Sequence, residues 1–78
     1  MYTAYIVKAD ETAKDARVAK AIVNLKLSGE DVVCLADDGY VTEIETLRAV
    51  KKIVGDSTLA TIEDAMAALV AHKNSAAE

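Results

Sequence analysis

The chain of 78 residues contains no proline, phenylalanine or tryptophan, and only one cysteine, one histidine and three glycines. A single cysteine excludes an intramolecular disulfide. Three scattered glycines cannot form the glycine-rich loop that cradles a phosphate group. Without large aromatic side chains, the core has to be built mainly from aliphatic residues, each of which buries less apolar surface than an aromatic ring. We therefore expect a thin core and modest stability from a single copy.

Basic residues are also few. Nine lysines and arginines are outnumbered by thirteen aspartates and glutamates, which leaves a net charge of −4. Such a chain is not expected to bind nucleic acid or an anionic membrane surface. The first residues lack the pattern of a signal peptide, and no apolar run approaches the roughly 20 residues of a membrane span. We predict a cytoplasmic protein that binds neither nucleic acid nor membrane.

Apolar side chains, in contrast, are abundant, at 53% of the residues. In so short a chain, this surplus indicates an interface with a second subunit or a partner. The single cysteine, Cys34, stands between Val33 and Leu35. That setting is typical of a small buried apolar residue, so we expect an unreactive thiol.

The first half of the chain predicts a strand, a helix and a second strand. Residues 2–7 and 31–36 are apolar and β-branched, as is typical of buried strands. Between them, two apolar rows at helical spacing predict a helix over about residues 12–27. This order fits a parallel β-α-β crossover unit. The boundaries that we expect for the helix are Asp10 or Thr12 at its start and Ser28-Gly29 at its end.

From Val41 the apolar residues recur at intervals of three or four and predict a second helix, which Gly55 ends. Thr42, with Glu45 three residues later, has the form of a capping box at the start of that helix. The preceding Asp38-Gly39 is also a favoured two-residue turn of a β-hairpin. A hairpin is therefore the alternative for this segment.

The last apolar stripe predicts a third helix that continues to about His72. Two starts are possible. Either Ser57 caps the helix, which is the version we favour, or residues 57–60 form a third short strand and Thr61 is the cap. Residues 74–78 are expected to form a flexible tail.

These elements predict a single domain over residues 1–73. The expected fold class is α/β, with α+β as the alternative: a small β-α-β unit followed by two helices, rich in helix, with a sheet of two or three strands.

One segment resembles the second half of the calcium-binding loop of EF-hand proteins. With Gly39 at the sixth place of the loop, Thr42 and Glu45 fall at the ninth and twelfth places. The first half departs from the family, because Cys34 and Ala36 occupy the first and third places, where the ion needs oxygen ligands. We therefore predict a turn here and no calcium site.

Asp37 and Asp38 directly follow the second predicted strand. If the two strands are parallel neighbours, Asp10 lies at the same edge of the sheet, and the three carboxylates are weak candidates for a magnesium site. That arrangement would suit magnesium-dependent phosphoryl transfer or a receiver-like domain, although a receiver needs more strands. Ordinary turn chemistry also explains the pair and is the favoured interpretation. No catalytic residue and no cofactor is predicted.

We predict a small acidic protein without enzymatic activity that binds a larger protein as an adaptor or inhibitor, in a regulatory or virus-encoded setting. The alternatives are the magnesium-dependent activity and a structural subunit of an assembly. A homodimer is also expected, since small side chains let two helices approach closely. The candidate interface residues are Ala67, Ala68 and Ala71 of the last helix and Val23 and Leu27 of the first.

Overall fold

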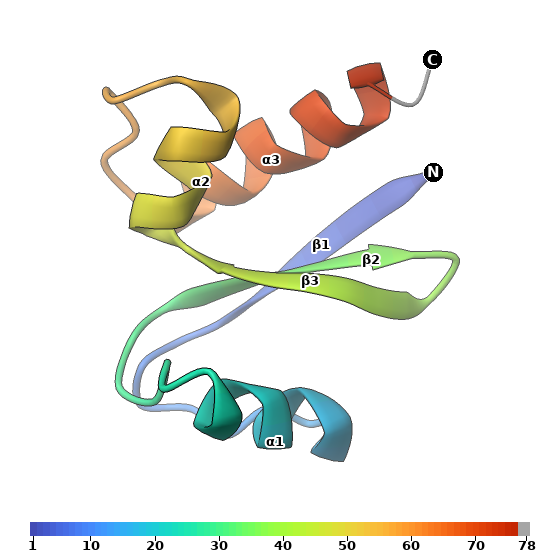
Figure 1. The fold of residues 1–78 in the computed structure, drawn as a ribbon, viewed down its shortest axis with the longest axis vertical. Helices are drawn as coiled ribbons and strands as arrows, with labels where there is room; N and C mark the ends of the chain where they lie inside the picture. The colour runs from blue at the N-terminus through green and yellow to red at the C-terminus, as the bar shows by residue number, and fades with distance from the viewer. Residues whose placement is uncertain (77–78) are drawn as a thin grey trace.

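Three antiparallel strands form one sheet in the order β1-β2-β3, with β2 in the middle (Figure 1). The computed structural model describes residues 1–76, in which there are three strands and three helices. The strands are β1 (Tyr2–Val7), β2 (Val32–Asp37) and β3 (Tyr40–Thr46), and the helices are α1 (Ala16–Asn24), α2 (Leu47–Val54) and α3 (Ile62–Ala76). The chain therefore has a small α+β fold, and the prediction of a helix-rich domain with a small sheet is confirmed.

The first two strands are neighbours but not parallel. Tyr2 lies opposite Asp37, and Val7 lies opposite Val32, so β2 begins at the end of the sheet where β1 finishes. The predicted order of strand, helix and strand is confirmed, whereas the predicted parallel crossover was wrong. The connection over residues 8–31 is long enough to carry the chain back in either direction, so its length does not decide the direction of pairing.

The segment after β2 is a hairpin, which was the alternative in the sequence analysis. Asp38 and Gly39 both have positive φ, 50° and 85°, as the two central residues of a type I′ turn do. Thr42 is consequently part of β3, where its hydroxyl lies 3.4 Å from the carbonyl oxygen of Leu35. The predicted helix start at Thr42, with its capping box, was wrong.

Strand β3 contains a bulge that explains this error. Val41 lies opposite Ala36 and Glu43 lies opposite Leu35, which leaves Thr42 as an extra residue. Because of this extra residue, Val41 and Ile44 point to the same face of the sheet although they are three positions apart, and both pack on the same apolar cluster. A spacing of three is typical of a helix, so the bulge gives a strand a helical apolar pattern.

Helix α1 is shorter than predicted at both ends. Asp15 caps it by accepting the backbone N–H of Arg17 at 2.8 Å. At its other end Lys26 adopts positive φ, 60°, and the N–H of Leu27 reaches the carbonyl oxygen of Ile22 at 2.8 Å. This pattern of bonds is a Schellman motif, which satisfies the last carbonyls of a helix. The boundaries predicted at Asp10 or Thr12 and at Ser28-Gly29 were therefore wrong.

The two later helices both begin at threonine caps. Thr46 caps α2 by accepting the N–H of Ala49 at 3.3 Å. Thr61 caps α3 by accepting the N–H of Asp64 at 3.1 Å, so the alternative start of the last helix was the correct one. Residues 57–60 are neither helix nor strand. Gly55 ends α2 with φ of 72°, which confirms the predicted stop.

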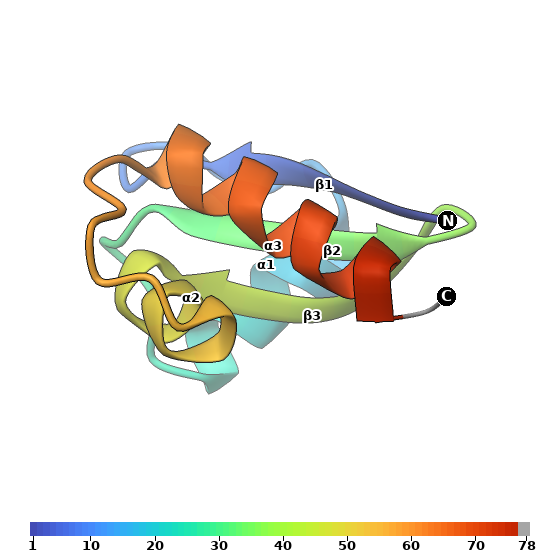
Figure 2. The ribbon, with the colours of Figure 1, turned by 90° about the horizontal axis from the view of Figure 1, so that it is seen from above.

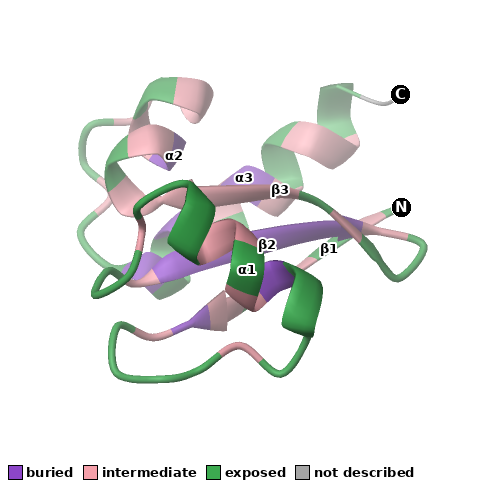
Figure 3. Ribbon diagram, turned by 60° about the horizontal axis from the view of Figure 1, so that its bottom comes forward, coloured by how far each residue is buried: buried purple, intermediate pink, exposed green. Residues whose placement is uncertain are grey.

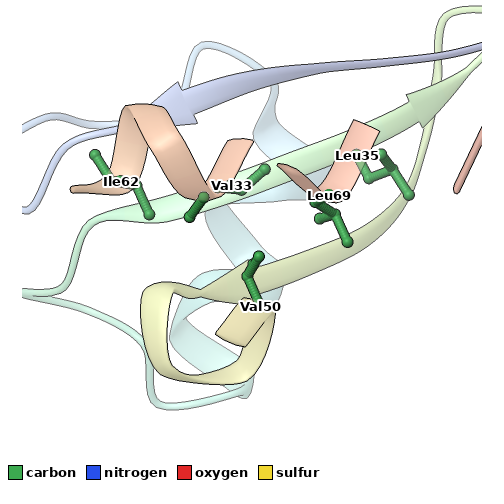
Figure 4. Close-up of a cluster of buried hydrophobic side chains, with 6 residues drawn as sticks. Val33, Leu35, Val50, Ile62 and Leu69 are labelled. Carbon is green, nitrogen blue, oxygen red and sulfur yellow. The ribbon is translucent and has the colours of Figure 1, made fainter. Parts of the chain in front are cut away.

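The sheet has a layer of helix on each face. In Figure 1, α2 and α3 lie above the sheet and α1 lies below it, and Figure 2 shows α3 crossing the sheet diagonally. Because successive residues of a strand point to opposite faces, β2 contributes to two cores. Figure 4 shows part of the first core, which comprises Val33, Leu35, Val50, Ile62, Ala65 and Leu69, and the second comprises Val7, Val18, Val32 and Cys34.

Helix α3 continues through Ala76. The prediction of a flexible tail was therefore wrong for residues 74–76, while residues 77–78 lie outside the described part of the chain. Asn74 is held against the start of β1, where its side chain makes two hydrogen bonds with the backbone of Tyr2. Over residues 1–76, no helix has both the length and the apolar character that crossing a membrane requires.

Candidate functional site

A groove with a volume of about 310 Å³ lies between α1 and β3. Its lining is mixed: Val18, Ala21, Val41 and Ile44 are apolar, with Leu25 and Tyr40 beside them, and Asp15, Arg17, Thr42 and Glu43 are polar or charged. Leu25 is 58% exposed and Tyr40 is 73% exposed. Figure 3 shows α1 in front of the sheet, with exposed residues along its outer side and around the turn between β2 and β3. The α1–β3 surface comprises Val18, Ala21, Leu25, Tyr40, Val41 and Ile44.

The backbone places both exposed side chains. The Schellman motif turns the chain after α1, so that Leu27 packs on the second core while Leu25, two residues earlier, remains exposed. The type I′ turn similarly places Tyr40 directly after Gly39, at the start of the edge strand. Because α1 ends at the end of the sheet away from the β2–β3 turn (Figure 1), Leu25 and Tyr40 flank opposite ends of the groove. Large apolar side chains that are exposed along one hollow are candidates for an interaction surface.

The other face of β3 is acidic. Glu43 and Glu45 lie opposite Leu35 and Val33, which places their side chains on the α3 side of the sheet. Lys73 of α3 binds Glu43, with 3.0 Å between Nζ and Oε1. Burial raises the pKa of the Glu45 carboxyl, and so does the neighbouring Glu43, while Lys73 lowers it by a smaller amount. Strand β3 therefore has one apolar face and one acidic face.

The structure separates the three candidate magnesium ligands. Asp37 and Asp38 lie at the hairpin end of the sheet, whereas Asp10 follows β1 at the opposite end. With five residue steps in β1 and about 3.4 Å per step, the two ends are roughly 17 Å apart. The three carboxylates cannot share one ion, because the strands are antiparallel. In the described part of the chain, no three side chains among His, Cys, Asp and Glu form a group that could hold a metal.

Cys34 lies in the second core and is fully buried as a free thiol. Burial raises the pKa of this thiol, which disfavours the reactive thiolate. Tyr5 lies on the neighbouring strand opposite Cys34. Burial, together with the nearby Cys34, raises the pKa of the Tyr5 hydroxyl to about 12. Both groups are therefore neutral near neutral pH.

A second hollow lies where β1 and β3 end and α2 and α3 begin. Lys8, Arg48 and Lys51 line it, but Asp31 and Glu63 line it too. Lys8 is bound to Glu63 at 2.7 Å, so part of its charge is already compensated. This mixed lining does not select a ligand of either sign.

The predicted interface residues do not form one surface. Ala67 and Ala71 are exposed and Ala68 is half-buried on α3, whereas Val23 is 65% exposed on α1, across the sheet from α3. Leu27 packs on the second core.

The sequence analysis missed Leu25 and Tyr40. By spacing, Leu25 shares a helical row with Val18. Val18 is buried, whereas Leu25 is exposed because the chain turns at Lys26 directly after it.

Comparison of the chain with protein-family models, with curated proteins and with solved structures gives no match. A function therefore has to be inferred from the arrangement of the chain's own residues. Of the hollows described above, the groove between α1 and β3 is the one beside which two large apolar side chains are exposed.

Proposed function

We propose that this chain is a small acidic binding module without enzymatic activity, which docks on a larger protein through the α1–β3 surface and acts there as an adaptor or inhibitor. The observation that carries the proposal is the exposure of Leu25 and Tyr40, 58% and 73%, beside one groove between α1 and β3. Aromatic and large aliphatic anchors next to a pocket are typical of the residues that dominate binding energy at protein interfaces.

Each of the two exposed side chains can make a substantial contribution to binding. Complete burial of a leucine side chain stabilises a complex by about 1.5–3 kcal/mol, before the cost of association is subtracted. A tyrosine buries more area than a leucine and loses little side-chain entropy, because it has only two rotatable bonds. Docking at Leu25 and Tyr40 would also cover Val41 and Ile44, which are only partly buried.

Two further features belong to this proposal. The protein acts in a reducing cytoplasm, in which a free thiol such as that of Cys34 stays reduced. It also forms a homodimer through α3, where exposed Ala67 and Ala71 would let a second helix approach closely.

The proposal is tested by affinity capture from the source cells with two matched variants. Leu25→Asp adds one carboxylate to the α1–β3 surface, and Ala71→Asp adds one to an exposed position of α3 on the other side of the sheet. Both variants are first checked for a native circular dichroism spectrum. We expect the wild-type chain and Ala71→Asp to retain the same larger protein and Leu25→Asp to lose it.

Two outcomes would contradict the proposal. A partner that is retained by Leu25→Asp and lost by Ala71→Asp would place the docking surface on α3. If the same proteins are retained by all three chains and by the empty resin, the chain is not a module of this kind.

A further inference from the structure

The outer edge of β1 is closed at both ends by the chain itself. At one end, the Asn74 side chain accepts the N–H of Tyr2 at 2.8 Å and donates to the carbonyl oxygen of Tyr2 at 3.2 Å. At the other end, the Glu11 carboxylate accepts the N–H of Lys8 at 3.1 Å, and the N–H of Glu11 donates to the Lys8 carbonyl at 3.0 Å. A strand that pairs along the whole of β1 would have to displace these bonds.

The bonds to Asn74 also show which residues of β3 direct their backbone N–H and carbonyl groups to the outer edge of the sheet. Since Tyr2 directs both backbone groups away from β2, the alternation of an antiparallel ladder directs those of Val33 and Leu35 toward β3. Their partners, Glu45 and Glu43, therefore bond to β2. The residue between them, Ile44, directs its N–H and carbonyl groups to the open edge.

The open edge at Ile44 is not closed in the same way. Among residues 1–76, none of the hydrogen bonds outside the sheet involves the backbone of Ile44. Figure 2 shows β3 as the outermost strand on its side of the sheet. An extended segment from another molecule can therefore pair with β3 without displacing a bond, which is the β-augmentation mode of peptide recognition.

The side chains beside this edge define what such a segment contains. A residue paired with Ile44 points to the same face as Ile44, which is the face of the groove between α1 and β3. Its two neighbours point to the opposite face, beside Glu43 and Glu45. Lys73 binds Glu43, whereas among the described residues no ion pair or hydrogen bond serves the Glu45 carboxylate.

We infer that the edge of β3 binds an extended segment in which an apolar residue is flanked by basic residues. The apolar side chain enters the groove between α1 and β3, and the basic side chains pair with Glu45 and, together with Lys73, with Glu43. This inference rests on the proposed function and specifies the chemistry of the partner. The main-chain bonds to Ile44 hold the segment, and the alternation of its side chains provides the selectivity.

A second copy of the chain does not fit this edge. Two β3 strands related by a two-fold axis at Ile44 would place Glu43 of one copy opposite Glu45 of the other. Like charges directly opposite each other destabilise a strand pair, and acidic side chains are a common device that keeps edge strands apart. Each copy also carries a net charge of −4. The same carboxylates that oppose self-pairing attract a basic strand.

The test measures amide hydrogen exchange by NMR on the isotope-labelled full chain. The probe is a short blocked peptide of alternating lysine and valine. The controls are a peptide of alternating glutamate and valine and a peptide with the lysines and valines in separate blocks. At a concentration of about ten times its Kd, the alternating basic peptide should slow exchange of the Ile44 amide about tenfold. Exchange of the Ala4 and Ile6 amides, on the edge of β1, should not change.

A variant of Glu45 tests the predicted ion pair with the basic peptide. Glu45→Gln keeps the shape of the side chain and should weaken the basic peptide about threefold at low salt, as expected for a partly exposed ion pair. The inference is overturned by any of three results. Exchange of the Ile44 amide is not slowed at peptide concentrations up to millimolar, the acidic peptide slows it equally well, or Glu45→Gln does not change the affinity for the basic peptide. Slower exchange of the Ile44 amide at higher protein concentration, without peptide, would also overturn it, because a second copy would then occupy the edge.

Failure here is distinguishable from failure of the proposed function. A partner that depends on Leu25 in affinity capture but leaves the Ile44 amide unprotected would leave the binding function standing and overturn only the β3 mode.

Discussion

Two threonines, Thr42 and Thr46, can each be replaced by alanine to distinguish the hairpin from a helix that begins at residue 42. In the structure, Thr46 caps α2 and Thr42 is the extra residue of a bulge in β3. Thr46→Ala removes the oxygen that accepts the N–H of Ala49 at 3.3 Å. Helix α2 contributes the fully buried Val50 to the first core, so fraying of its first turn weakens that core as well.

The expected loss for Thr46→Ala is about 1 kcal/mol, within the usual range for an N-cap threonine. For a domain of this size, that loss lowers Tm by about 4–8 °C. Thr42 is exposed, and its hydroxyl makes only a long contact of 3.4 Å with the Leu35 carbonyl. Thr42→Ala should therefore cost no more than about 0.5 kcal/mol, as surface substitutions usually do.

The assay is thermal unfolding followed by circular dichroism, with denaturant unfolding of both variants as a check on the free energies. The reasoning is refuted if Thr42→Ala costs about 1 kcal/mol while Thr46→Ala costs nothing measurable. That result would mean that the helix starts at Thr42 and that the hairpin is absent.

Four further predictions follow from single side chains. Cys34 should react slowly with a thiol reagent in the native protein and rapidly in denaturant, since burial raises the pKa of its thiol; rapid native labelling would contradict its place in the core. The raised pKa of Glu45 means that the folded state binds its proton more tightly than the unfolded state, so the stabilising effect of that proton is lost as pH rises through the folded pKa. Glu45→Gln should therefore gain stability relative to wild type between acidic and neutral pH, and equal pH profiles would refute this. Asn74→Ala should cost about 1–2 kcal/mol and speed exchange of the Tyr2 amide, because it removes both of their hydrogen bonds; unchanged exchange would show that Asn74 does not close the edge. Finally, sedimentation should show a dimer that Ala71→Arg shifts toward monomer, and a wild-type protein that stays monomeric from micromolar to millimolar concentration would end the dimer hypothesis.

The sequence predicted the existence of the elements better than their arrangement. The apolar β-branched run of residues 2–7 gave β1 with its observed bounds, and β2 was displaced by only one residue. Both signals are local, since they depend on side chains that alternate or cluster along one strand. The direction of pairing between these strands is not local. It depends on contacts made after residues 8–31 have returned the chain to the sheet.

The two largest errors have specific physical causes. The bulge at Thr42 placed Val41 and Ile44 on one face at helical spacing, which hid the hairpin despite the strong turn signal of Asp38-Gly39. The parallel assumption then brought Asp10 to the wrong end of the sheet, and the candidate magnesium site depended on that placement.

The groove between α1 and β3 could not be predicted for a related reason. Its two exposed side chains depend on turns whose geometry the composition only partly indicates. Gly39 signals the turn before Tyr40, but Lys26, a residue with a Cβ, occupies the left-handed position after Leu25. No glycine marks that turn, and by spacing alone Leu25 falls in one helical row with the buried Val18.

Docking of a protein partner on the α1–β3 surface can be detected by site-specific photo-crosslinking in the source cells. A benzoylphenylalanine is introduced in one chain at Tyr40 and in another at Ala67, an exposed position of α3 across the sheet from α1. We expect an adduct with a larger polypeptide from the Tyr40 position and none with that polypeptide from the Ala67 position. An adduct with the larger polypeptide that forms only from Ala67, or an adduct from Tyr40 with the mass of two copies of this chain, would rule out docking on this surface.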